Sequence, residues 1–157
     1  MDIIELLPRS GNFYKVNLHT HSTLSDGNFT PLELKDLYLS NGYDAIAFTD
    51  HRKCIPHPDL TDEKFLAITG TELDFSQKDE NGKLLKAVHL NAFSYDPLKS
   101  SEYVGMPLDY ELINRMIEQL KNDNFFVVLN HPVWSNMSSE EINKIHGFDA
   151  MEINNSI

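Results

Sequence analysis

Two histidines separated by one residue lie at the end of a short apolar run near the start of the sequence. The run extends from Val16 to His21, and Asp26 follows five residues after the second histidine. If residues 16–21 form a strand, His19 and His21 point to the same face, because side chains alternate along a strand. Two imidazoles on one face with a carboxylate close behind suit a divalent metal ion. For this stretch alone, two surface histidines beside a turn are the simpler interpretation.

Further histidines and acidic residues accompany other apolar runs. They are His51 after residues 45–50, Glu72 after 66–69, His89 within 87–93 and His131 after 125–130. These residues offer nitrogen and oxygen donors without sulfur, a set that suits Zn²⁺, Mn²⁺ or Fe²⁺. Five histidines and two acidic residues exceed the needs of one tetrahedral ion, so we expect a multinuclear site with Glu72 as a bridging carboxylate. Such sites lower the pKa of a bound water toward ~7 and hold anionic substrates, which suits the hydrolysis of phosphate esters.

Alternating strand and helix signals indicate an α/β fold that would position these residues. Apolar runs without alternation are typical of strands buried on both faces of a parallel sheet. We therefore expect about six mainly parallel strands covered by helices, with the ligands at the carboxyl ends of strands. The expected strands are residues 13–19, 45–50, 66–69, 87–93, 125–130 and 150–153, and the expected helices are 31–40, 110–122 and a short one from 138.

Local signals refine this outline. Thr30 and Glu33 form a capping box around a proline, which predicts a helix start there. The spacing of Leu34, Leu37 and Tyr38 predicts the buried face of that helix. A hairpin turn is expected near residues 81–82, a helical turn at 62–65 and a long loop at 94–107.

Composition narrows the class of protein. The chain has 157 residues, which suits one domain, and a formal net charge of −11, which argues against a broad nucleic-acid-binding or anionic-membrane surface. Bound cations would still allow a small anionic substrate. No apolar run approaches the ~20 residues needed to cross a membrane, and the start lacks the basic region of a secretory signal. Cys54 is the only cysteine, which excludes an intrachain disulfide, so we expect a cytoplasmic protein.

The motifs "LHTHSTLSDG", "FTDH", "GTEL", a histidine on the next strand and "LNHP" occur in that order. This series resembles the PHP (polymerase and histidinol phosphatase) family of metal-dependent phosphoesterases, and the resemblance covers about residues 16–152. It implies a distorted (β/α)7 barrel that holds two to three divalent metal ions, Zn, Mn or Fe, at its carboxyl rim. It further implies that a metal-bound hydroxide hydrolyses a small phosphorylated substrate, without a separate protein nucleophile.

The resemblance also implies a metal-binding role for seven residues. The strand register leaves open whether His89, or Asn91 on the same face, points into the site. The implied sets are His19, His21 and Glu72 for a first metal, Glu72, His89 and His131 for a second, and Asp26 with His51 for a third.

Several neighbours of these residues have expected roles of their own. We expect Asp50 to orient an imidazole. Arg52 and Lys53 either contact a substrate phosphate or lie on a solvated loop. Glu152 either lines the rim or forms a buried salt bridge, and Trp134 is expected to anchor the core or the rim.

The sequence departs from the family in one respect. The family pattern ends with Asp-x-His on a later strand, and no such motif follows Glu152. The last strand and the closing helix are also missing, so we expect a single PHP-type domain over residues 1–157 that is an incomplete barrel, truncated at its C-terminus. The first and third metals would each lose one ligand. The alternative function is therefore a catalytically impaired metal-binding relic or accessory domain, and the open barrel edge predicts self-association.

Overall fold

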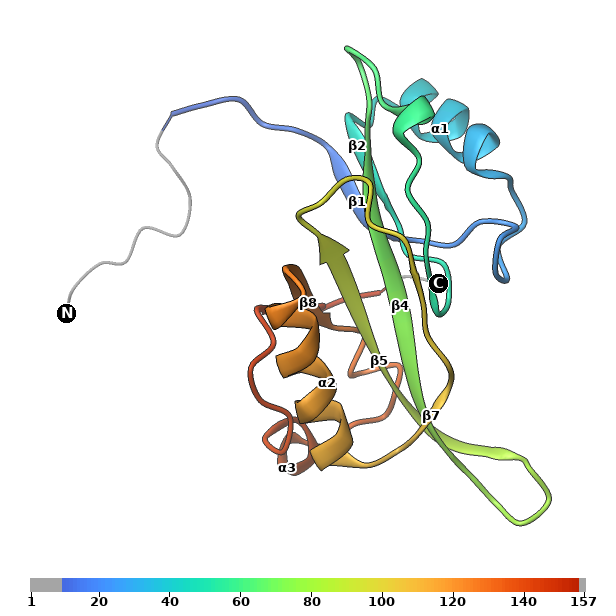
Figure 1. The fold of residues 1–157 in the computed structure, drawn as a ribbon, viewed down its shortest axis with the longest axis vertical. Coiled ribbons are helices and arrows are strands. Elements are labelled where there is room, and N and C mark those ends of the chain that lie inside the picture. The colour runs from blue at the N-terminus through green and yellow to red at the C-terminus, as the bar shows by residue number, and fades with distance from the viewer. Residues whose placement is uncertain (1–9, 156–157) are drawn as a thin grey trace.

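The computed structural model describes residues 10–155 (Figure 1). Helices and strands begin close to the positions that the sequence predicts for most elements. In chain order the elements are β1 Val16–Thr20, α1 Pro31–Ser40, β2 Ala45–Phe48, β3 Lys53–Cys54, the 3-10 turn Pro58–Leu60, β4 Leu66–Lys78, β5 Leu84–Ser94, β6 Ser101–Glu102, β7 Met106–Pro107, α2 Tyr110–Asn122, β8 Phe125–Leu129, α3 Ser139–Ile142 and β9 Ala150–Met151.

Most neighbouring strands of the main sheet are parallel, as expected, but the sheet is mixed because β5 runs in the opposite direction. The strand order of the sheet is β1-β2-β4-β5-β8-β9, with β7 beside β4. Neighbouring strands are parallel from β1 to β4 and again between β8 and β9, whereas β5 runs antiparallel to both β4 and β8. The reason is the tight turn at residues 79–83, because two strands joined by so short a connection must pair antiparallel. The architecture is a mixed α/β fold with a curved, partial-barrel sheet.

Strand β4 is much longer than the sequence predicts. It continues past residues 66–69 to Lys78, so Glu72 lies in the middle of a strand and not at its end. The pairing of β4 with β5 runs from Gly70 opposite Phe93 to the end of the hairpin. A Cβ at position 70 would lie only 3.0 Å from the Phe93 ring, so glycine allows the close approach of β5 there.

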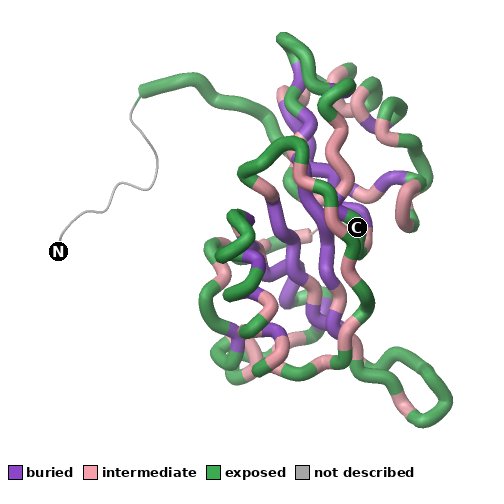
Figure 2. The backbone as a smooth tube through the Cα atoms, in the orientation of Figure 1, coloured by how far each residue is buried: buried purple, intermediate pink, exposed green. Residues whose placement is uncertain are grey.

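Side-chain alternation on the central strands separates a core face from a polar face. Leu73 and Phe75 of β4, with Leu90 of β5, are buried in a cluster that also contains the apolar stripe of α2. The intervening residues, among them Glu72 and His89, point to the opposite face of the same strands. Figure 2 shows the buried backbone concentrated along these central strands. Packing of the apolar face therefore fixes the strand register, and this register determines which polar side chains lie together on the other face.

A second cluster holds α1 against β2. The predicted capping box is present: the Thr30 side chain accepts a hydrogen bond from the backbone N–H of Glu33, and the Glu33 carboxylate accepts one from the backbone N–H of Thr30. Leu34 is buried as predicted, but Leu37 is 44% exposed, so the buried stripe is narrower than its spacing suggests. The helical turn expected at residues 62–65 does not form; Asp62 instead accepts hydrogen bonds from the backbone of two following residues.

The sheet curls so that strands distant in its order approach each other. The Asn91 side chain of β5 donates a hydrogen bond to the carbonyl of Leu18 in β1, 3.3 Å away, although β2 and β4 lie between these strands in the sheet. The end strands β1 and β9 carry exposed apolar side chains such as Leu18 and Met151. Self-association through these edges stays a prediction. Within residues 10–155, no helix has the length and apolar character required to cross a membrane.

Candidate metal centre

The carboxylate of Glu72 lies at the centre of a ring of imidazoles and is almost fully buried, with 1% of the residue exposed. Its two oxygens contact five histidines that come from four separate segments of the chain. Oε1 lies 3.1 Å from His89 Nδ1, 3.3 Å from His19 Nε2 and 3.3 Å from His131 Nε2, and Oε2 lies 3.1 Å from His21 Nε2 and 3.4 Å from His51 Nδ1.

The described residues contain four overlapping groups whose potential ligand atoms lie within 4.8 Å of one another. Two of these groups contain the same residues as sets that the resemblance implies, and a third adds His21 to the implied pair of Asp26 and His51. The fourth contains Glu152, whose role the sequence left open. The groups are His19, His21 and Glu72; Glu72, His89 and His131; His21, Asp26 and His51; and His19, His131 and Glu152.

The spacing of these donor atoms fits metal coordination. Donors bonded to zinc at about 2.0–2.1 Å in a tetrahedron lie about 3.3 Å from one another. His19 Nε2 and His21 Nε2 are 3.1 Å apart, and both lie near the oxygens of Glu72. Two imidazole nitrogens repel each other at this distance unless a cation or a shared proton lies between them. The chemistry of the donors, histidine and carboxylate without sulfur, therefore suits divalent metal ions.

The electrostatics of the site favour an ionised Glu72. Burial alone would raise the pKa of the Glu72 carboxyl, but hydrogen bonds from His131, His19 and His21 outweigh it and hold the pKa far below its ordinary value. Burial would likewise lower the pKa of His19, but the hydrogen bond and charge of Glu72 outweigh burial and raise it. For His51 burial dominates and lowers the pKa. A buried anion surrounded by imidazoles is an attractive position for positive charge.

The loop between β1 and α1 delivers Asp26. Asp26 Oδ1 lies 3.2 Å from His21 Nδ1, and Oδ2 lies 3.5 Å from His51 Nε2. Asp50 stabilises this loop. It accepts hydrogen bonds of 2.7–2.8 Å from the Ser22 backbone N–H, the Ser22 hydroxyl and the Ser25 hydroxyl. This differs from the expected role of Asp50, since its described bonds go to the loop and not to an imidazole. Its negative charge serves to shape the segment that carries Asp26.

Sequence reasoning missed one residue and left a second undecided. Asn130 is buried, and its amide donates a hydrogen bond to Glu72 Oε1 at 2.8 Å. Glu152 accepts a hydrogen bond of 2.9 Å from the backbone N–H of His131 and lies 3.4 Å from His19 Nδ1. The position of Asn130 directly before a predicted ligand was the available signal. Trp134, expected in the core or at the rim, is 56% exposed and lies edge-on to the His131 ring with 4.9 Å between centroids.

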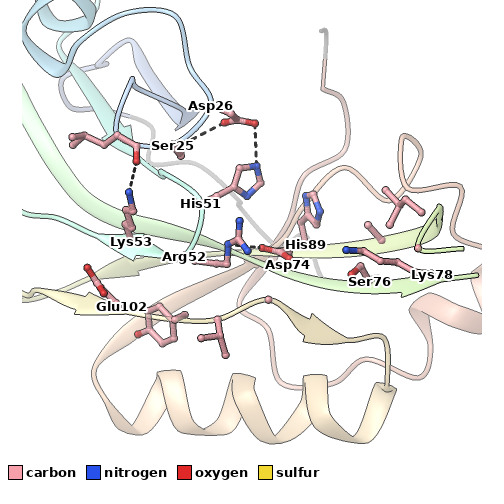
Figure 3. A pocket seen from close by; sticks show the side chains of 17 residues that line it. Ser25, Asp26, His51, Arg52, Lys53, Asp74, Ser76, Lys78, His89 and Glu102 are labelled. Carbon is pink, nitrogen blue, oxygen red and sulfur yellow. Dashed lines mark hydrogen bonds and ion pairs between the residues drawn. The ribbon is translucent and has the colours of Figure 1, made fainter. Parts of the chain in front are cut away.

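Two clefts meet at the candidate centre. One, of about 670 Å³, contains the imidazoles, Glu72 and Glu152. The other, of about 920 Å³, contains Arg52, Asp74 and Lys78, and it shares Asp26, His51 and His89 with the first. Figure 3 shows the second cleft with these side chains along its wall.

The two basic residues after His51 differ in their contacts. The Arg52 guanidinium forms an ion pair with Asp74, with 3.3 Å between Nε and Oδ1, on the wall of the larger cleft (Figure 3). The Lys53 ammonium donates a hydrogen bond to the Leu24 carbonyl at 2.7 Å. Arg52 has a φ of 60°, and its backbone N–H bonds to the Glu72 carbonyl at 2.7 Å. The left-handed backbone directly after a candidate ligand directs the guanidinium into the cleft.

Comparisons with known proteins agree with this architecture. No family model matches the chain. The chain superposes on a protein of Bifidobacterium adolescentis with an inferred metal-dependent phosphoesterase function, with a TM-score of 0.63 and 17% identity, covering 91% of this chain and 78% of that one. A two-domain protein of Bacteroides vulgatus that contains a predicted PHP-like metal-dependent phosphoesterase matches with a TM-score of 0.50 and 24% identity, over 86% of this chain and 43% of that one.

A sequence match reaches a much larger protein. Over 78 residues the chain is 32% identical to the DNA polymerase/3′-5′ exonuclease PolX of Bacillus subtilis. The match includes 49% of this chain but only 14% of that relative, so the chain corresponds to a small part of it.

Proposed function

Because this chain has the fold of PHP-like metal-dependent phosphoesterases, we propose that it is itself a metal-dependent phosphoesterase with a multinuclear centre. The observation that carries the proposal is the position of Glu72, whose two oxygens each face a different set of imidazoles. A carboxylate in that position is suited to bridge two ions. Divalent ions held there would supply Lewis-acid charge to phosphate oxygens and lower the pKa of a water molecule.

The protein residues hold and orient the reacting groups. The proposed first set is His19, His21 and Glu72, the second is Glu72, His89 and His131, and the third is His21, Asp26 and His51. Each set contains at least one negative oxygen or shares Glu72, so the protein charge balances part of the charge of the ions. No nucleophilic side chain is needed for hydrolysis under this proposal.

The larger cleft is the proposed place for the rest of the substrate. It opens from the candidate centre through Asp26, His51 and His89. We assign Arg52 the contact with a substrate phosphate, because it directly follows His51 and its side chain lines the cleft (Figure 3). Lys53 lines the same cleft, but its ammonium donates a hydrogen bond to the Leu24 carbonyl. We therefore assign it a smaller role than Arg52 in binding the phosphate. A small phosphorylated substrate fits this arrangement.

The proposal is tested first by metal content. Protein purified without chelator should contain Zn, Mn or Fe, and the Glu72→Gln variant should lose most of it while Glu118→Gln, at an exposed position of α2, keeps it. Phosphatase assays on a panel of phosphomonoesters with added Mn²⁺ should then show hydrolysis by the wild-type chain and not by Glu72→Gln. Wild-type protein without bound metal after purification and after Mn²⁺ addition would exclude the proposal.

A metal-binding relic or accessory domain is the alternative. It predicts bound metal without hydrolysis of any phosphate ester, so the two assays together separate it from an active enzyme. The match to PolX motivates one further assay, degradation of a single-stranded oligonucleotide from its 3′ end. The net charge of −11 argues against a broad nucleic-acid surface, so we expect this assay to be negative.

A further inference from the structure

We propose that Glu152 is a positioning residue of the candidate centre, which fixes the tautomer of His19 and the backbone of His131. The inference rests on the proposed metal centre and goes beyond it, because it assigns a role to a residue outside the three proposed metal sets. Glu152 follows directly after β9, at the far end of the sheet from His19 in β1. The curled sheet brings the two together, with 3.4 Å between Glu152 Oε1 and His19 Nδ1.

The two nitrogens of His19 face different partners. Nε2 lies 3.3 Å from Glu72 Oε1 and 3.1 Å from His21 Nε2, which is the proposed metal set. Nδ1 faces Glu152. An ionised carboxylate only accepts hydrogen bonds, so it holds the proton on Nδ1 and leaves the lone pair of Nε2 directed at the metal set. Because Nε2 of His19 belongs to the proposed metal set, we assign Glu152 to a hydrogen bond with Nδ1 and not to direct coordination alongside His19.

The other oxygen of Glu152 stabilises the second ligand. Oε2 accepts a hydrogen bond of 2.9 Å from the backbone N–H of His131, whose φ is 26°. This backbone conformation is unfavourable for a residue with a side chain, so it requires support from its surroundings. The same carboxylate therefore orients two ligands, one from the end strand β1 and one that follows β8. Asn155 donates a further hydrogen bond of 3.1 Å to Oε1.

The isosteric variant Glu152→Gln separates this role from simple packing. The backbone N–H of His131 can only donate, whereas the Asn155 amide can rotate and His19 can change tautomer. The carbonyl oxygen of the glutamine would therefore face His131, and its NH₂ group would face His19 Nδ1. That nitrogen must then accept, the proton moves to Nε2, and His19 can no longer offer Nε2 to a metal ion. Glu152→Asp keeps the charge but shortens the side chain, so we expect its zinc affinity to lie between those of the wild type and Glu152→Gln.

The experiment uses Zn²⁺ as the only probe, with the full chain. Chelator competition should show 10–100-fold weaker binding of one zinc equivalent in Glu152→Gln, with no change in Glu118→Gln. In the zinc-loaded wild type, ¹H–¹⁵N spectra of the imidazoles should show His19 protonated at Nδ1, and this signal should be lost in Glu152→Gln. Circular dichroism and Glu152→Asp provide the fold control, and Glu152→Asp is judged by the same readouts if Glu152→Gln does not fold.

Two results would overturn the inference. One is unchanged zinc affinity and an unchanged His19 signal in the folded variant. The other is loss of a zinc equivalent while His19 stays protonated at Nδ1, which would make Glu152 a direct ligand. Neither readout involves a substrate, so a chain that hydrolyses no phosphate ester can still show the expected tautomer change, and failure of the proposed activity remains distinct from failure of this inference.

Discussion

The amide nitrogen of Asn130 donates a hydrogen bond to Glu72 Oε1 at 2.8 Å, and its amide oxygen accepts one from the Asn91 backbone at 3.3 Å. The side chains of Asn130 and Glu72 are both buried. The second bond fixes the orientation of the amide, so the NH₂ group faces the carboxylate. Glu72 thus has one partner that would remain in place when metal ions occupy the space among the imidazoles.

Asn130→Ala removes that donor. We expect the free energy of unfolding of metal-free protein to fall by about 2 kcal/mol, because a buried charged acceptor loses a hydrogen bond. Asn130→Asp should be less stable still in the presence of chelator, since it places a second carboxylate against Glu72, and Zn²⁺ should narrow its deficit. Urea unfolding with and without Zn²⁺ measures both, with the exposed Asn143→Ala as control. Equal stability of the two Asn130 variants in chelator would contradict this reasoning.

Gly27→Ala should disturb the loop that carries Asp26. A Cβ at position 27 would lie 2.1 Å from the His21 carbonyl oxygen, so the backbone must move. We expect a loss of about 1–3 kcal/mol in unfolding free energy, in the range of other forced overpacking, together with weaker binding at the set containing Asp26. Gly82→Ala serves as a comparison, because no atom lies within 4 Å of a Cβ there and its effect comes only from its φ of +81°. Zinc stoichiometry should change in Gly27→Ala and stay constant in Gly82→Ala.

At position 52 two substitutions separate the effect of the backbone conformation on stability from the effect of the guanidinium on substrate binding. Arg52→Ala and Arg52→Gly both remove the side chain from the cleft, so both should raise the KM for a phosphate ester similarly. The φ of 60° suits glycine better than alanine, so Arg52→Gly should be about 1 kcal/mol more stable than Arg52→Ala. Thermal unfolding and Michaelis–Menten kinetics check the two expectations independently. A KM that follows stability, and not the presence of the guanidinium, would argue against a substrate contact.

Glu141 provides a pH-dependent contribution to stability outside the metal centre. Its hydrogen bond and ion pair with Lys86, together with the Ser138 backbone N–H, lower its pKa from 4.5 to about 2 in the folded protein. The folded pKa lies below the unfolded value, so the stabilisation is fully present above pH 4.5 and is lost as the pH falls toward 2. The difference in urea midpoint between wild type and Glu141→Gln should therefore shrink between pH 6 and pH 3. A constant difference over that range would show that charge contributes nothing there.

Much of the local structure is readable from the sequence, because its causes are local. The capping box at Thr30, the α2 helix over residues 110–122 and the turn at residues 79–83 each depend on neighbouring side chains and formed where expected. The extension of β4 to Lys78 depends on its pairing with β5, which no single segment encodes. The sequence therefore predicted the elements better than their arrangement.

In the candidate site, too, the sequence predicted some features well and others poorly. The residues expected as ligands gather around Glu72, and the ordered motifs were the signal for them. The supporting roles were harder to predict: Asp50 holds a loop, Asn130 contacts a carboxylate and Glu152 reaches His19 from the other end of the sheet. These roles depend on how the sheet curls, since the partners are between 25 and 133 residues apart in the chain.

The contact between His19 and Glu152 has a consequence for synthesis of the protein. These residues are separated by 133 positions, whereas Glu72 and His89 are 17 apart on one hairpin. During translation this hairpin can pair early. His19 can contact Glu152 only after nearly the whole sheet has been synthesised. Under the proposed function we therefore expect full zinc affinity only after residue 152 has emerged, and a nascent chain arrested before residue 131 should hold zinc only loosely.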